Sequence, residues 1–223
     1  MKPLQNFTFE SFDFDQQTLS ASFRYSFDHE VKFTETIDFS CLGRKPLTNP
    51  DPSVMNHLLF HLSLAVGISY YKLCPTAKLM IESGFLTPDQ ITFWEAFYLN
   101  GLGEYFYRNN ISPKEVVQFE NTKEAKDFDF LHAHFACESK QIMVALGGGK
   151  DSLVSCELVK KGGLPFYTST FGKDYFLHQM TSKKVGAPRL VMKRTMDPQL
   201  FAMNQQGYYN GHVPISGIIA FVL

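Results

Sequence analysis

Apolar and polar residues alternate along the first forty positions of the chain. Phe7 and Phe9 begin the pattern, and it continues through Leu19, Ala21, Phe23, Tyr25, Phe27, Phe33, Ile37 and Phe39. An apolar period of two residues is typical of strands that bury one face, and aromatic side chains suit such a surface. The pattern therefore predicts two or three antiparallel strands that form a small sheet.

Helical signals follow a linker rich in proline and asparagine. Asp51 and Pro52 supply a cap and a rigid first turn for a long helix predicted at 53–73. A Thr-Pro-Asp sequence predicts the start of a second helix, at 87–99. The segment 101–109 follows, where Glu104 and Arg108 would be four positions apart on one face if the helix resumes. The mixed, charged residues that come next predict a connection between two units.

A different pattern begins near residue 141. Short apolar runs predict strands that alternate with helices: strands at 142–146, 165–170 and 189–192, and helices at 150–161 and 174–185. This alternation is typical of a parallel, doubly wound sheet. We therefore expect an α+β domain at 1–135, built of antiparallel strands plus helices, followed by an α/β domain at 136–223.

The α/β domain is predicted to be incomplete. Residues 211–223 resemble the beginning of a helix that has no capping or polar residues at its end. In addition, three parallel strands would leave an apolar sheet edge uncovered. These features predict that the chain is the N-terminal part of a longer protein, or that another element completes it.

Composition excludes several protein classes. The 223 residues are 44% hydrophobic, and the four cysteines form no CxxC pair. A disordered tail, a collagen-like fibre, a disulfide-stapled miniprotein and a zinc knuckle are therefore excluded. Polar residues interrupt the longest apolar stretch, 54–71, so we expect no membrane span. The polar, acidic start and the unpaired cysteines favour a cytoplasmic protein.

Charge divides unevenly along the chain. Residues 1–135 carry a net charge of −6 and residues 136–223 a net charge of +5. This asymmetry favours an anionic ligand for the second unit, with chance scatter as the alternative. The basic residues are dispersed and are not interleaved with aromatic residues, so we expect no nucleic-acid partner.

A glycine-rich turn between a predicted strand and helix carries the clearest chemistry. Its residues are Gly147, Gly148, Gly149, Lys150, Asp151 and Ser152. Glycines let a backbone approach phosphate closely, and the following helix start adds partial positive charge. Asp151 is the candidate magnesium ligand. The alternative is a tight turn that binds no ligand.

Three phosphate-binding motifs compete for this turn. The nucleoside-triphosphate P-loop fails because Val144 replaces its first glycine and Asp151 follows the lysine. The dinucleotide fingerprint lacks both its last glycine and an acid at the end of the next strand. The turn resembles the SGGxDS loop of the PP-loop ATP pyrophosphatases at every position except the first, where Gly147 replaces serine. That resemblance implies an adenine nucleotide alpha hydrolase-like domain that cleaves ATP between its α and β phosphates.

Four segments in one order carry a narrower resemblance. They are Gly67 to Lys72, Gly101 to Glu104 with Tyr107 and Asn109, the glycine turn, and Asn210 to Pro214. Together they are similar to the UDP-N-acetylmuramoyl-L-alanyl-L-glutamate epimerase family, which acts in peptidoglycan precursor synthesis. The resemblance implies ATP and Mg²⁺ dependence, a UDP-N-acetylmuramoyl-dipeptide substrate, and inversion of its terminal L-glutamate through an acyl-adenylate with release of AMP and pyrophosphate.

Three titratable residues of these segments are candidates for the active site. Glu104 and Lys72 are predicted to transfer protons, since glycines and aromatic residues could desolvate each of them. The alternatives are a surface ion pair with Arg108 for Glu104 and a solvated helix end for Lys72. His212 is expected to contact ATP or substrate, because it lies between a turn and a helix start.

Other residues give weaker signals. His57 and His61 have a spacing that suits a metal, but their apolar helix face favours a structural role. His132 and His134 are expected to be solvated. Lys193 and Arg194 end the third parallel strand, where they would contact a phosphate or form an exposed basic pair. Another PP-loop enzyme, or a nucleotide-binding remnant without turnover, remains an alternative function.

Overall fold

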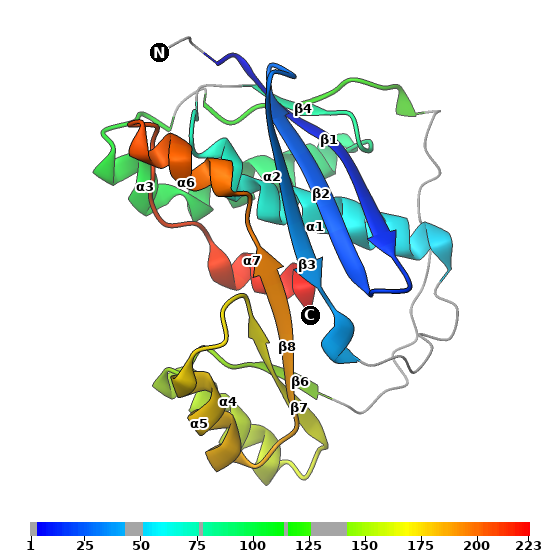
Figure 1. The fold of residues 1–223 in the computed structure, drawn as a ribbon, viewed down its shortest axis with the longest axis vertical. Helices are drawn as coiled ribbons and strands as arrows, with labels where there is room; N and C mark the ends of the chain where they lie inside the picture. Colours follow the sequence, from blue (N-terminus) through cyan, green and yellow to red (C-terminus); the bar gives the residue numbers. More distant parts are fainter. Residues whose placement is uncertain (1–3, 43–50, 76–77, 114–115, 126–141) are drawn as a thin grey trace.

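A computed structural model describes residues 4–42, 51–75, 78–113, 116–125 and 142–223. The chain folds as an α+β structure with a mixed sheet, whose strand order is β5-β4-β1-β2-β3-β8-β7-β6 (Figure 1). The predicted domain boundary at residues 135 and 136 lies outside the described residues, as do His132, His134 and Cys137.

The alternating N-terminal segment forms three antiparallel strands, as predicted. They are β1 (Asn6–Asp15), β2 (Ser20–Phe27) and β3 (Val31–Asp38), with Phe7 opposite Phe27 and Tyr25 opposite Phe33. The apolar positions of each strand face the core, which confirms the interpretation of the period of two. Two further strands were not predicted: β4 (Lys78–Ile81) lies parallel to β1, and β5 (Phe119–Asn121) lies parallel to β4.

Helices follow in the chain and pack beside this sheet. The long helix α1 (Pro52–Tyr71) starts at Asp51, whose carboxylate accepts the Ser53 backbone N–H, and it packs on β1 and β2. Helix α2 (Pro88–Gly101) begins with a capping box, and the short α3 (Gly103–Arg108) follows it. All three match the sequence predictions. The core between α1 and the strands is rich in buried aromatic rings.

The second half of the chain forms parallel strands joined by helices, as predicted. The order along the chain is β6 (Ile142–Ala145), α4 (Lys150–Lys161), β7 (Phe166–Phe171), α5 (Phe176–Val185) and β8 (Arg189–Thr195). Helices α4 and α5 contact each other and lie on one face of these strands (Figure 1). Consecutive strands are neighbours here, so both right-handed crossovers fall on the same side. The doubly wound arrangement is therefore not seen among the described residues.

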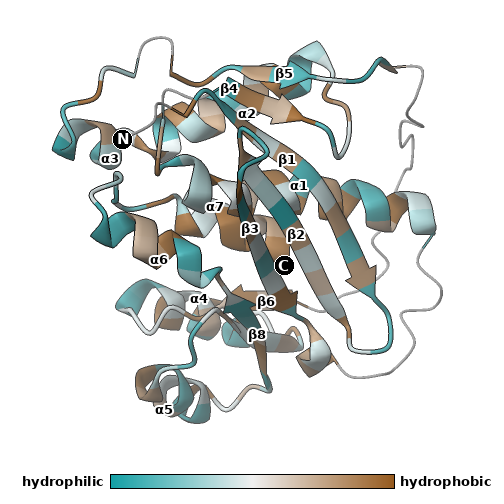
Figure 2. Cartoon of the chain, turned by 45° about the horizontal axis from the view of Figure 1, so that its top comes forward, coloured by the Kyte–Doolittle hydropathy of each residue, from teal (hydrophilic) through white to brown (hydrophobic). Residues whose placement is uncertain are grey.

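Strand β8 joins the two groups of strands. Its first half pairs in parallel with β7, and its last three residues pair in antiparallel fashion with β3. After β8 the chain forms α6 (Pro198–Gln205), an irregular segment and α7 (Ile215–Val222), while the short 3₁₀ turn η1 (Ser40–Leu42) follows β3. Figure 2 shows α7 as a strongly hydrophobic helix, which packs against α1. Among the described residues, no helix is long and apolar enough to cross a membrane.

Candidate functional site

Three of the four sequence segments that carried the family resemblance meet in space. The end of α1 contributes Lys72, α3 contributes Glu104, and the irregular segment between α6 and α7 contributes His212. These residues are separated by up to 140 positions, so the fold alone brings them together. We call Lys72, Glu104, Tyr105, Asn210, Gly211 and His212 the motif cluster.

Lys72 is a buried amine at the carboxyl end of α1. Its side chain is 8% exposed, and its Nζ donates to the Gly211 carbonyl at 2.6 Å and to Asn210 Oδ1 at 3.0 Å. Burial lowers the pKa of Lys72 to about 8, with a further decrease from the charge of Arg194. The alternative of a solvated helix end is therefore wrong, and the predicted desolvation of Lys72 is confirmed.

Tyr105 connects Lys72 to the turn at Gly211. Its hydroxyl donates to the Lys72 carbonyl at 2.6 Å, and its ring lies against Gly211. A Cβ atom added at Gly211 would lie 2.8 Å from Tyr105 Cδ2, so only glycine fits without displacing the ring. Asn109 Nδ2 donates to the Asn210 carbonyl at 3.1 Å. The turn is thus attached to both α1 and α3.

Glu104 and His212 form an exposed pair beside this turn. His212 Nδ1 lies 2.8 Å from Glu104 Oε2, and Arg108 lies 3.6 Å from the other carboxylate oxygen. The hydrogen bond from His212 lowers the pKa of Glu104, and the charges of His212 and Arg108 lower it further. The prediction that burial would desolvate Glu104 is wrong because half of its side-chain surface is exposed. The predicted surface pair with Arg108 is present, with His212 as an additional partner.

The glycine turn between β6 and α4 has an open backbone. Gly148 has φ +78°, a conformation that favours glycine, and Gly147 and Gly149 face open space. No side chain caps the first amides of α4, which begins at Lys150. Ser152 Oγ donates to the Gly149 carbonyl at 2.8 Å, so the hydroxyl braces the turn.

A phosphate fits this turn better than a protein-bound metal does. The uncapped amides and the exposed Lys150 together suit an anion. Asp151 is exposed and supplies one carboxylate, and the described residues contain no group of three potential metal ligands. Asp151 would therefore hold Mg²⁺ only together with phosphate oxygens and water, a common arrangement for this ion.

The glycine turn and the motif cluster are separate in the structure. Among the described residues, no hydrogen bond or ion pair joins them, and Gly148 instead lies against Leu177 of α5. The parallel strands nevertheless direct their carboxyl ends, and thus the glycine turn, toward the side on which α6 and α7 lie (Figure 1).

Arg194 has a partner that the sequence did not reveal. Its guanidinium forms a buried pair with Glu35 on β3, with Nε 2.7 Å from Oε1, and it donates to Ser69 Oγ at 2.8 Å. Both predictions for Arg194, a phosphate contact or an exposed basic residue, are therefore wrong. The neighbouring Lys193 is exposed, as one of those alternatives expected.

His57 and His61 form part of an aromatic contact. His61 Nδ1 accepts a hydrogen bond from Trp94 Nε1 at 3.1 Å, and burial lowers its pKa to about 4. The structural role is confirmed, because an accepting Nδ1 and a neutral ring fit the packing against α2.

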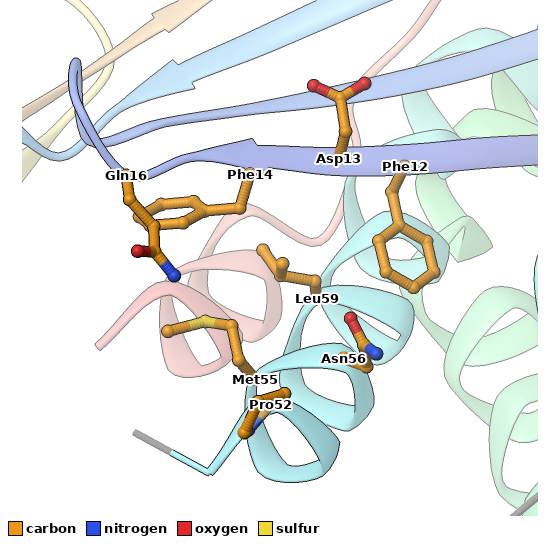
Figure 3. Close-up of a pocket in the computed structure, with 8 residues that line it drawn as sticks. All are labelled: Phe12, Asp13, Phe14, Gln16, Pro52, Met55, Asn56 and Leu59. Carbon is orange, nitrogen blue, oxygen red and sulfur yellow. The ribbon is translucent and has the colours of Figure 1, made fainter. Parts of the chain in front are cut away.

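A shallow pocket lies at the other end of α1. Figure 3 shows its lining side chains: Phe12, Asp13, Phe14, Gln16, Pro52, Met55, Asn56 and Leu59. Its acidic residue, Asp13, forms an ion pair with Arg24. The lining residues on α1, Pro52 to Leu59, precede Lys72 by several helical turns, so roughly 20–30 Å separates this pocket from Lys72. The pocket therefore lies apart from the motif cluster, and no residue of the glycine turn lines it.

Comparison with known proteins identifies the family. The family model for the MurL N-terminal domain matches residues 1–223. The chain belongs to the MurL N-terminal domain family. Two relatives of this family member are named UDP-N-acetyl-alpha-D-muramoyl-L-alanyl-L-glutamate epimerase. The Xanthomonas oryzae pv. oryzae protein is 29% identical over 99% of this chain, and the Salinispora tropica protein is 30% identical over all of it.

The chain spans about half the length of these relatives, since the alignments cover 48% of each. No solved structure matches it. The motif cluster therefore lies in the MurL N-terminal domain. Sequence reasoning named its titratable residues but gave no role to Tyr105, which no titration or spacing argument selects. Its close packing against Gly211 joins two distant motifs and is visible only in the structure.

Proposed function

We propose that this chain contributes to the ATP-dependent epimerisation of the terminal L-glutamate of UDP-N-acetylmuramoyl-L-alanyl-L-glutamate. One observation carries the proposal: residues from three distant segments form a single cluster in a chain whose relatives carry the epimerase name. The cluster contains a buried amine and a histidine paired with a carboxylate. Such groups suit proton transfer at neutral pH.

The glycine turn would bind the phosphates of ATP. The amides of Gly148 and Gly149 and the exposed Lys150 would contact phosphate oxygens, and Asp151 would hold Mg²⁺ beside them. The hydroxyl of Thr170, at the carboxyl end of the adjacent β7, is 98% buried and has no hydrogen-bond partner within the described structure. A ligand in this position could satisfy it.

Activation of the substrate explains why an epimerase would consume ATP. A carboxylate resists loss of its α-proton because the resulting carbanion would lie beside existing negative charge. Attack of the carboxylate oxygen on the α-phosphorus of ATP expels pyrophosphate and gives a mixed anhydride. Its acyl group no longer carries the carboxylate charge, so the Cα–H is more acidic. After the proton has been removed and returned on the other face, water cleaves the anhydride, releases AMP and regenerates the carboxylate.

His212 is the group best arranged to move that proton. Glu104 holds its Nδ1 at 2.8 Å, which leaves Nε2 for the substrate, and the histidine side chain is 81% exposed. In this arrangement Glu104 orients the imidazole through its Nδ1, as a carboxylate does in other histidine-dependent enzymes. Since ATP is the proposed co-substrate, we expect the reaction to take place in the cytoplasm.

A direct assay tests this function. The chain is incubated with ATP and Mg²⁺, with and without UDP-N-acetylmuramoyl-L-alanyl-L-glutamate, and AMP and the chirality of the glutamate are measured in the same tube. We expect AMP that depends on the substrate, together with D-glutamate. The Xanthomonas oryzae epimerase serves as the positive control. A chain that neither turns over nor binds ATP would contradict the proposal, and ATP binding without substrate-dependent AMP would favour a nucleotide-binding remnant.

A further inference from the structure

We infer that Lys72 is a positioning residue, which fixes the turn at Asn210 and Gly211 and thereby sets His212 against Glu104. The inference rests on the proposed proton-transfer role of His212. It assigns Lys72 a task different from proton transfer, the role that its sequence position suggested.

The hydrogen bonds of Lys72 show how it would act. Its Nζ donates to the Gly211 carbonyl and to Asn210 Oδ1, and the same Oδ1 accepts the backbone N–H of Gly211 at 2.8 Å. The amine therefore binds both peptide and side-chain oxygens of the residue pair that precedes His212. Two or more bonds to one short turn restrict its backbone far more than a single contact would.

Burial strengthens this assignment. Among the described residues no ion pair joins Lys72 to a carboxylate, and the like charge of Arg194 acts on it unfavourably. Burying an ammonium without a charged partner costs free energy, so we expect the buried amine to have a specific role. The two oxygen acceptors account for its hydrogen bonds, and a side chain with 8% exposure has little access to substrate.

The remaining contacts make the turn sensitive to Lys72. Tyr105 is fixed to the Lys72 carbonyl and packs on Gly211, while Glu104 is the preceding residue on α3. Loss of the Lys72 bonds would let the turn shift relative to α3 while Glu104 stayed in place. A shift of about 1 Å in a catalytic group can reduce turnover about 100-fold.

Substitutions at Lys72 distinguish positioning from proton transfer. Lys72→Met removes the hydrogen bonds and keeps the length of the side chain, whereas Lys72→Gln keeps a donor that cannot act as a base. Lys78→Met, at an exposed lysine paired with Glu120, is the matched control. We expect Lys72→Met to reduce kcat for epimerisation about 10- to 100-fold with little change in KM, and Lys72→Gln to recover part of the loss.

Amide hydrogen exchange tests the inference without relying on activity. We expect the Gly211 amide to exchange about tenfold faster in Lys72→Met than in the wild type or in Lys78→Met. Unchanged Gly211 exchange in Lys72→Met would overturn the inference. So would a Lys72→Gln variant as inactive as Lys72→Met with its fold intact, which would mark Lys72 as a proton carrier. If no variant or wild type shows epimerisation, the proposed function fails while the exchange result still decides whether Lys72 fixes the turn.

Discussion

The region built on β1–β5 and the region built on β6–β8 bury their interiors to very different extents. The first has a large core of aromatic rings beneath α1, which also takes in Met192 of β8. The second region's own cluster of buried apolar side chains is small among the described residues: Val144, Leu146, Cys156 and Val185. The second also exposes apolar residues on α4 and α5, including Val154, Leu158, Phe176 and Met180. The first region can therefore hold a side chain in a fixed, buried position, whereas the second holds its side chains less tightly.

This difference matches the chemistry proposed for each region. The large core holds a desolvated lysine and a fixed turn, as precise proton transfer requires. The smaller region presents a glycine turn whose amides are open to solvent, which suits a ligand that must enter and leave. Regions with few buried contacts open at lower free energy, and ligand binding stabilises them.

The largest effect is expected at the glycine turn. Asp151→Ala should reduce AMP formation about 1000-fold or more, because a divalent cation on phosphate stabilises the transition state by several kcal/mol. The matched control is Glu157→Ala, which removes an exposed carboxylate from the same helix. AMP production that is unchanged in Asp151→Ala would show that the turn is not the nucleotide site.

The buried ion pair between Arg194 on β8 and Glu35 on β3 links the two regions and provides a test of stability. Arg194→Met leaves Glu35 buried without its partner, and should lower the free energy of unfolding by about 3–5 kcal/mol. The double variant that also carries Glu35→Leu should recover much of the loss, since no charge then remains buried. Denaturant unfolding measures both. A double variant no more stable than Arg194→Met would mean that the pair contributes through its hydrogen bonds to α1.

Leucine truncations compare the two interiors directly. Leu64→Ala, in the buried part of α1, should destabilise the chain by about 2–5 kcal/mol, because it leaves a cavity in the core. Leu158→Ala, on the exposed face of α4, should change stability by less than about 0.5 kcal/mol. Equal losses would show that the α4 face is covered in solution.

The buried amine predicts a pH dependence. Folding lowers the pKa of Lys72 from 10.5 to about 8. Between these two pH values Lys72 is protonated in the unfolded chain and deprotonated in the folded chain. The contribution of Lys72 to the free energy of unfolding therefore rises with pH. From about pH 8 to about pH 10.5, wild type should gain up to about 3 kcal/mol relative to Lys72→Met. Parallel pH profiles for the two proteins would contradict the burial of a titrating amine.

Local patterns in the sequence were sufficient to predict most of the fold. The alternation at Phe7 to Phe39, the caps at Asp51 and Thr87 and the glycine turn each depend on neighbouring residues, so their structures follow from short-range chemistry. Strands β4 and β5 were missed because three or four residues carry no recognisable period. Their parallel pairing depends on distant partners.

Long-range contacts explain the differences at the candidate site. The titratable residues of the cluster could be named from their motifs, but their environments could not. Lys72 is buried by a turn 138 residues away, and Arg194 is neutralised by Glu35 on a strand 159 residues earlier. No local pattern encodes either contact. Glu104 was expected to be desolvated by its neighbours, yet it lies on the outer face of a six-residue helix.

One measurement tests most directly whether the two regions have separate roles, nucleotide cleavage at the glycine turn and proton transfer at the motif cluster. AMP release and D-glutamate formation are followed together in His212→Ala, with His29→Ala as a control that removes another histidine paired with glutamate. The account predicts that substrate-dependent AMP release persists while D-glutamate formation falls about 100- to 10,000-fold, as expected for loss of a general acid–base group. A variant that forms D-glutamate at the wild-type rate, or that loses AMP release to the same extent, would contradict it.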